Sequence, residues 1–224
     1  MNKSRRLLAC ALGACAISLL ASNAFGQANK FYVKFDLGGS IAEDVDLEEF
    51  FGESVAGGDV ELEPGFRFGI AGGFWVTDWF APELEFGGVM NSIDRFGGSS
   101  AVDATLSQFP LMVNAKFQLP NRFIVTPYAG AGVGFSTAVL SADYMQLGNT
   151  YLDGDEADMV FCWQAFAGIR FALAEDIGLS LEYRFLAADS PSWESDYSFN
   201  TTTDRVRFGE SKVQSLSIAF DFRF

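Results

Sequence analysis

The chain has 224 residues, enough for one sizeable all-β domain or for two small ones. Its net charge of −14 argues against a nucleic acid as partner, and the lack of His excludes His-assisted nucleophilic or general-base catalysis. The combination of 24 Phe and 23 Gly is unusual for a soluble core and indicates a Phe-rich surface in apolar surroundings.

The first residues have the pattern of a secretory signal peptide. A basic head with Lys3, Arg5 and Arg6 precedes the apolar run "LLACALGACAISLL", which is too short to span a membrane comfortably. Small residues follow, and cleavage fits after Ala24, Gly26 or Ala28. We therefore predict a signal peptide over residues 1–26, export through the Sec pathway, and one domain over residues 27–224.

Two other export signals overlap this segment. "LGAC" (Leu12 to Cys15) looks like a lipoprotein cleavage box, although the apolar run continues beyond it. "SRRLL" (Ser4 to Leu8) resembles a twin-arginine signal, which carries folded cargo. Removing the signal peptide leaves Cys162 as the single cysteine, so no disulfide can form within one chain.

Eight segments then alternate large apolar residues with small or charged ones, as strands with two unlike faces do. At the C-terminus, for example, Leu216, Ile218 and Phe220 share one face and Ser217 and Ala219 share the other. The segments cover residues 31–39, 66–76, 81–90, 109–117, 124–135, 161–171, 177–185 and 213–224. Pro110 falls inside the fourth segment and predicts a bulge or a ragged strand end there.

The connections between these segments alternate in length. Tight turns are expected near Thr77, Pro120 and Ala174. The four other connections are expected to be long loops, at roughly residues 40–63, 91–105, 139–158 and 188–209. This alternation predicts an eight-stranded antiparallel up-and-down transmembrane β-barrel with its short turns and both termini on the periplasmic side of an outer membrane.

The apolar face of these strands should point outward. An eight-stranded barrel has an interior just wide enough for side chains to fill, and the many Phe residues of the apolar face cannot fit there. Hydrocarbon is therefore the expected solvent of that face. Aromatic girdles are expected at both interfaces. The periplasmic girdle comprises Phe74, Trp75, Trp79, Phe80, Phe117, Phe123, Phe171, Phe222 and Phe224, and the outer one comprises Phe66, Phe135, Phe161 and Trp163.

The opposite face places charges of both signs in the lumen. The cations are Lys34, Arg67, Lys116, Arg170, Arg184 and Arg223, and the anions are Asp36, Glu83, Glu85, Glu182 and Asp221. An unpaired buried charge costs several kcal/mol, so we expect a plugged interior cross-linked by salt bridges. The alternative is a narrow gated pore, because inward-facing glycines leave some empty volume. Glu83 and Glu85 resemble paired catalytic acids, but ion pairing is the favoured interpretation.

The excess negative charge lies in the expected long loops. One acidic cluster could hold Ca²⁺ or Mg²⁺, because such cations prefer several oxygen ligands, and bound cations could bridge to lipopolysaccharide. That cluster comprises Asp153, Asp155, Glu156 and Asp158. Its spacing does not match an EF-hand, and a solvated, repulsive surface fringe is the favoured interpretation. No cofactor is predicted.

Four motifs in this order and spacing resemble the small outer-membrane barrels of the OmpA-type and opacity-protein group. They are "PYAGAGVGF" (127–135), "AFAGIRF" (165–171), "LEYRF" (181–185) and the terminal "FDFRF". The resemblance implies that Phe224, with Phe222, forms a signal read by the barrel-assembly machinery. It also implies outer-membrane lipid and lipopolysaccharide as partners.

The family includes adhesins and structural anchors, so the resemblance indicates a location more than an activity. The barrel lipases, deacylases, palmitoyl transferases and proteases use a histidine, which this chain lacks. We therefore expect a non-enzymatic structural or adhesin-like role through the acidic extracellular loops, with an unidentified extracellular ligand. The alternative is a small, weakly conducting porin for polar solutes.

Overall fold

The computed structural model describes residues 30–50, 53–96, 102–120, 123–147, 150–194 and 205–224. The predicted signal peptide over residues 1–26 and its three candidate cleavage positions lie outside the described residues. Among the residues described, no helix is long and apolar enough to cross a membrane.

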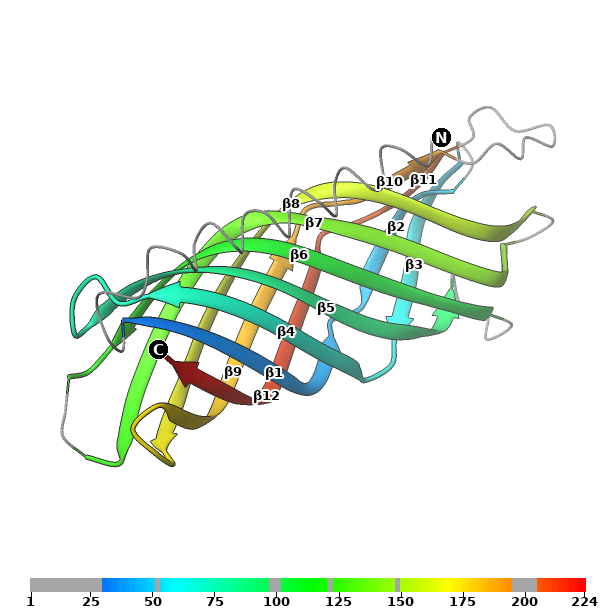
Figure 1. Cartoon of the computed structure of the whole chain (residues 1–224). Coiled ribbons are helices and arrows are strands. Elements are labelled where there is room, and N and C mark those ends of the chain that lie inside the picture. Colours follow the sequence, from blue (N-terminus) through cyan, green and yellow to red (C-terminus); the bar gives the residue numbers. More distant parts are fainter. Residues whose placement is uncertain (1–29, 51–52, 97–101, 121–122, 148–149, 195–204) are drawn as a thin grey trace, which may run out of the picture.

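Eight antiparallel strands close into a barrel (Figure 1), which confirms the predicted fold. Closure is made by β1, which pairs with β4 on one side and with the C-terminal strand β12 on the other. The eight strands are β1 (Phe31–Ala42), β4 (Gly65–Phe74), β5 (Phe80–Phe96), β6 (Val102–Gln118), β7 (Val125–Leu147), β8 (Thr150–Ala172), β9 (Ile177–Ala188) and β12 (Ser211–Arg223).

The three predicted tight turns lie at one end of the barrel, where β1 begins and β12 ends (Figure 1). In the first of them the Thr77 hydroxyl accepts hydrogen bonds from the backbone N–H groups of Trp79 and Phe80. Phe31 and Phe224 exchange two backbone hydrogen bonds, of 3.2 and 2.9 Å, beside these turns. We call this end the C-terminal mouth.

The barrel wall has the predicted orientation. Phe35, Leu84 and Ile218 are exposed on the outside, whereas their neighbours Lys34, Glu83 and Ser217 are buried inside. Most of the predicted girdle residues are exposed or half-buried on the outer face. Trp75 is the exception: it is 7% exposed and packs inside the barrel against Tyr32 and Ala81, so its assignment to the girdle was wrong. Trp75 has the same parity as the inward-facing Arg67 and Ala71, so the two-residue alternation continues past Phe74 and places Trp75 inside the barrel.

The expectation of long loops at the other end was largely wrong. Most of residues 40–63 form strands β2 (Val45–Phe50) and β3 (Glu53–Leu62), and short strands β10 (Ser192–Glu194) and β11 (Arg205–Phe208) lie beside them. The order β10-β11-β2-β3-β5 extends the wall beyond the ends of β1, β4, β9 and β12, while β5 to β8 continue as long strands (Figure 1). We call this extension the distal tier.

The distal tier has an apolar core of its own. Its hairpin keeps the two-residue period, because Val45 and Leu47 are buried while Asp46 and Glu48 are exposed. The core residues come from the strands β2, β3, β10 and β11 and from the long strands β5, β6 and β7. They are Val45, Leu47, Val60, Ile93, Ala104, Leu106, Ala138, Leu140, Ala142, Trp193 and Phe208. The tier is therefore a packed β-structure rather than a fringe of loops.

Pro110 does not cause the predicted bulge. The register between β5 and β6 is the same before and after it, from Phe86 opposite Leu111 to Val89 opposite Gln108. The pairing is interrupted only between these positions, where proline cannot donate a backbone hydrogen bond. The ring packs beside Gly87, where a Cβ built on the glycine would lie 3.7 Å from Pro110 Cγ, an ordinary van der Waals distance.

Candidate functional site

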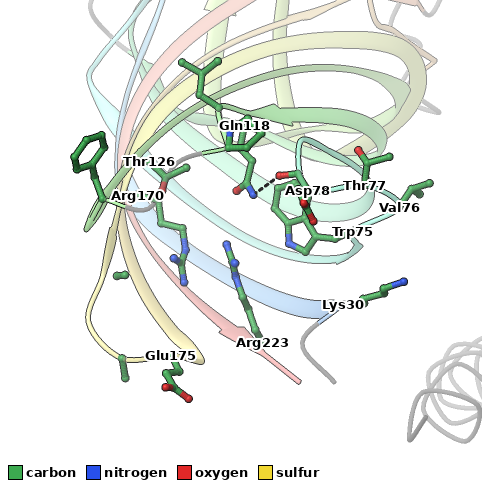
Figure 2. A pocket seen from close by; sticks show the side chains of 15 residues that line it. Lys30, Trp75, Val76, Thr77, Asp78, Gln118, Thr126, Arg170, Glu175 and Arg223 are labelled. Atoms are coloured by element: carbon green, nitrogen blue, oxygen red, sulfur yellow. Dashed lines mark hydrogen bonds between the residues drawn. The ribbon is translucent and has the colours of Figure 1, made fainter. Parts of the chain in front are cut away.

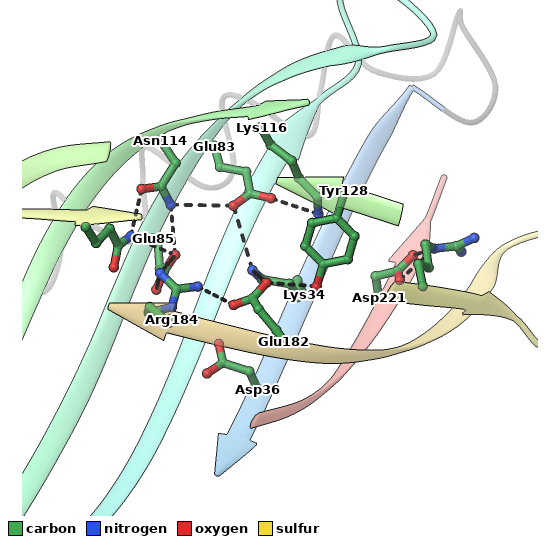
Figure 3. A network of polar contacts seen from close by, with 12 residues as sticks. Lys34, Asp36, Glu83, Glu85, Asn114, Lys116, Tyr128, Glu182, Arg184 and Asp221 are labelled. Carbon is green, nitrogen blue, oxygen red and sulfur yellow. Dashed lines mark hydrogen bonds and ion pairs between the residues drawn. The ribbon is translucent and has the colours of Figure 1, made fainter. Parts of the chain in front are cut away.

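The membrane-level interior of the barrel holds a compact ion-pair network (Figure 3). Its charged groups project inward from β1, β4, β5, β6 and β9 because each occupies an inward position in the alternation of its strand. They are the cations Lys34, Arg67, Lys116 and Arg184 and the anions Asp36, Glu83, Glu85 and Glu182. The two signs balance, and all eight residues are buried.

Glu85 lies between two arginines. Its Oε1 is 2.7 Å from Arg67 Nη2 and 2.8 Å from Arg184 Nη1. Its Oε2 accepts hydrogen bonds from the side-chain amides of Asn114, at 2.8 Å, and Gln164, at 3.3 Å. Arg67 also reaches Asp36 Oδ1, at 3.2 Å. Glu85 is thus satisfied by charged and neutral donors from four other strands.

Glu83 and Glu182 are joined through Lys34. Lys34 Nζ lies 3.0 Å from Glu182 Oε2 and 3.8 Å from Glu83 Oε1. Lys116 Nζ adds a contact of 3.1 Å to Glu83, and Arg184 Nη2 pairs with Glu182. This part of the network therefore cross-links four strands of the barrel.

Aromatic rings complete the surroundings of these charges. The Tyr32 and Tyr128 hydroxyls donate to Glu83 and Glu182, respectively. Lys116 Nζ lies 4.8 and 4.6 Å from the centroids of these two tyrosine rings, and Arg184 Cζ lies 4.8 Å from the centroid of Phe166. Such cation–π contacts stabilise buried cations in addition to their ion pairs.

Several of these side chains were not singled out from the sequence. Tyr32, Asn114, Tyr128, Gln164 and Phe166 take part in the network, although only charged residues were proposed. The signal that could have found them is parity, since each lies on the inward face of its strand.

The other three predicted lumen residues lie outside this network. Arg170, Asp221 and Arg223 gather at the C-terminal mouth, where they line or adjoin a cavity of about 830 Å³ (Figure 2). Arg170 Nε lies 2.8 Å from Asp221 Oδ1, and Arg223 Nε lies 3.7 Å from Asp221 Oδ2. The predicted charges thus form two groups rather than one.

The acidic segment proposed as a divalent-cation loop is part of strand β8. Asp158 accepts a backbone hydrogen bond from Ser192, at 2.9 Å, and so ties β10 to β8. Glu156 is half-buried, and the side chains of Asp153 and Asp155 lie outside those described. Among the described residues, no three acidic or cysteine side chains converge as metal ligands.

The two proposed assembly-signal residues are near the end of β12. Phe222 and Phe224 are both exposed on the outer face of the barrel at the C-terminal mouth. Their role in assembly stays a prediction.

Comparisons with known proteins agree with this architecture. Neisserial surface protein A is 17% identical with a TM-score of 0.55, over 88% of this chain and 99% of that chain. The outer-membrane protein OprG from Pseudomonas aeruginosa is 13% identical with a TM-score of 0.55, over 88% and 97%. The outer-membrane protein AlkL is 14% identical with a TM-score of 0.53, over 88% and 92%. At these identities the likeness concerns the fold.

A search of curated protein sequences found no match to the chain. The family described as "Outer membrane protein beta-barrel domain", however, matches residues 7–224. This match spans every described strand, and the strands form a closed eight-stranded barrel with an apolar outer face. The chain therefore belongs to the outer-membrane β-barrel protein family.

Proposed function

We propose that this outer-membrane protein is a closed, non-enzymatic barrel that presents its distal tier at the cell surface in a structural or adhesin-like role. The observation that supports this role is that two different fillings follow one another along the barrel. The balanced ion-pair network occupies the membrane-level interior, and the apolar core of Leu47, Leu140 and Phe208 fills the distal tier. Solute passage would require both fillings to open.

The absence of enzymatic activity is part of this proposal. Glu83 and Glu85 are the nearest approach to a pair of catalytic acids, and each is held by two cations. A carboxylate held in this way is stabilised in its ionised form and has no room beside it for a substrate. Ion pairing therefore accounts for both residues without catalysis.

The outer surface of the distal tier is where contact with partners is expected. Glu43, Asp44, Asp46 and Glu48 are exposed there, next to the buried positions of the β2 strand. We propose that this acidic surface meets lipopolysaccharide through divalent cations or remains solvated as a repulsive layer. For its biogenesis, we propose that the protein is exported through the Sec pathway and that the barrel-assembly machinery recognises its C-terminal strand.

A weakly conducting pore is the second candidate, and a specific observation favours it. Several buried polar atoms of the interior have no hydrogen-bond partner: Asp36 Oδ2, Arg67 Nη1, Gln164 Oε1 and Arg184 Nε. Buried polar atoms of this kind are usually satisfied by ordered water. A chain of such waters would give polar solutes a narrow path.

Ion conductance in a planar bilayer separates the two candidates. The folded protein should give no stable current steps, and a heat-unfolded control should give none either. Reproducible steps that disappear on unfolding would contradict the closed barrel and favour the pore.

The surface role is tested on cells that carry the wild-type protein or a variant in which residues 45–62, the β2–β3 hairpin, are replaced by a short turn. Binding to host and abiotic surfaces should fall in the variant at equal surface display. Unchanged binding would contradict an adhesin-like role of this hairpin.

A further inference from the structure

The C-terminal mouth differs from the ion-pair network in its charge balance. Two guanidinium groups, from Arg170 on β8 and Arg223 on β12, share the single buried carboxylate of Asp221. Arg170 Nε donates hydrogen bonds to both oxygens of this carboxylate, at 2.8 and 2.9 Å. Arg223 Nε is left at 3.7 Å, within ion-pair distance but without a hydrogen bond. The mouth therefore carries one positive charge more than its buried carboxylate neutralises.

Donor groups at the mouth also lack acceptors. Arg170 is only 8% exposed, and its Nη2 has no hydrogen-bond partner. The same is true of Arg223 Nε and of Trp75 Nε1, whose ring lies 5.6 Å from Arg223 Cζ. Leaving a buried donor unsatisfied costs roughly 1–3 kcal/mol, and more for a charged group. Three such donors around one space indicate that an acceptor belongs there.

The space itself is large enough for a ligand. Arg170, Arg223 and Trp75 line the cavity of about 830 Å³, and Figure 2 shows the two arginine side chains converging in it. Lys30 adds a third cation at the rim. The lining acids Asp78 and Glu175 lie on exposed turns, where solvent screens their charges.

We propose that the C-terminal mouth binds an oxyanion, a phosphate or carboxylate group, between the guanidinium groups of Arg170 and Arg223. Planar guanidinium groups present paired N–H donors that match the oxygens of both anions. Such a ligand supplies the missing negative charge and accepts hydrogen bonds from the unpartnered donors. The short turns of the family face the periplasm, so the ligand is a periplasmic one, either a free small anion or the acidic end of a larger molecule. This site is independent of whether the lumen conducts.

Calorimetric titration of the protein in lipid nanodiscs tests the proposal, because nanodiscs leave both ends of the barrel accessible. The probes are inorganic phosphate, propionate, and a pentapeptide with either a free or an amidated C-terminus. Two variants disrupt the site in different ways. Arg223→Gln removes one cation at the partly exposed rim, and Gly178→Ala keeps every charge but places a Cβ 2.4 Å from Arg170 Nε and Nη2, which must move. The matched controls are Arg95→Gln, in an exposed ion pair with Glu61, and Gly72→Ala, which has open space around its Cβ.

At least one oxyanion probe should bind the wild-type protein, and its affinity should fall about tenfold or more in both site variants and stay unchanged in both controls. Tighter binding of phosphate or propionate would identify a free anion as the source, and tighter binding of the peptide with a free C-terminus would identify the end of a larger molecule. The proposal is overturned if no probe binds, or if Arg223→Gln and Arg95→Gln weaken binding equally. Circular dichroism establishes whether each variant is folded. If Gly178→Ala does not fold, the comparison of Arg223→Gln with Arg95→Gln decides the test.

Discussion

At the scale of single residues, the network is charge-balanced, so that removing one buried carboxylate leaves one positive charge uncompensated. Glu85 is 1% exposed and lies between Arg67 and Arg184. Glu85→Gln should therefore lower the free energy of unfolding by about 3–5 kcal/mol, since breaking a buried pair leaves an uncompensated charge. Urea unfolding in lipid bilayers, followed by tryptophan fluorescence, measures this difference.

The matched control is Glu61→Gln, which removes a carboxylate from the exposed pair with Arg95 in the distal tier. Exposed pairs contribute about 0–1 kcal/mol, because water and salt screen them. Equal losses from Glu85→Gln and Glu61→Gln would show that the buried network does not hold the barrel together.

At the scale of elements, the contact between β6 and β7 depends on small inward residues. A Cβ at Gly134 would lie 2.0 Å from the backbone oxygen of Leu111 on β6, whereas one at the outward Gly72 would meet nothing within 4 Å. Gly134→Ala should therefore destabilise the barrel by about 1–3 kcal/mol through overpacking. Gly72→Ala should be neutral or slightly stabilising, because glycine is unfavourable inside a strand. The same unfolding measurement compares them, and the reverse order would contradict the close approach of β6 and β7.

The distal tier is a separate element of stability, since its core is apolar and the network below it is ionic. Leu47 is 2% exposed in that core, and its neighbour Asp46 is exposed. Leu47→Asp buries an unpaired charge and should open the β2–β3 hairpin to protease, while the membrane-level strands stay protected by lipid. Asp46→Asn should leave the cleavage pattern unchanged. Limited proteolysis of intact proteoliposomes distinguishes the two variants, and a protected hairpin in Leu47→Asp would mean that the tier is not packed on Leu47.

The limits of prediction from the sequence are physical, and the hairpin illustrates them. The eight membrane strands could be predicted because a hydrocarbon solvent requires an unbroken apolar face on each of them. Beyond the membrane that requirement ends, so β2 carries acids on its outward face and its sequence resembles that of a loop. The sequence does alternate the apolar Val45 and Leu47 with the acidic Asp46, but the many acidic residues of the segment make it resemble a solvent-exposed loop.

The candidate sites show a second limit. Parity identifies which side chains enter the lumen but gives no height along the barrel, and height depends on strand tilt and register. For this reason the eleven predicted lumen charges were treated as one group. The register instead places Arg170 opposite Thr126 and Asp221 opposite Gly178, each near a turn, whereas Glu182 and Arg184 lie further along β9. The uncompensated cation at the mouth follows from this separation.

At the scale of the whole molecule, the two fillings form barriers in series, and the conductance of such a path is limited by the barrier that stays closed. Removing a balanced pair from the network, with Lys34→Ala and Glu182→Ala together, opens only the polar part. Removing the edge-to-face pair Trp193 and Phe208, whose ring centroids lie 5.0 Å apart, opens only the apolar part. Ions avoid a narrow apolar constriction because it excludes water, and they avoid a packed ionic plug because it leaves no free volume.

Each double variant alone should therefore be silent in a planar bilayer, and the variant that combines all four substitutions should conduct. The comparison is made on proteins whose folded state is established by circular dichroism, with a heat-unfolded sample of each as the blank. Conduction by the network variant alone would mean that the distal tier already leaks and that the ionic plug is the only gate, which is the arrangement expected of a pore. Conduction by the four-substitution variant alone would mean that the barrel is closed at two levels. The protein would then act through the outer surface of its distal tier rather than through its lumen.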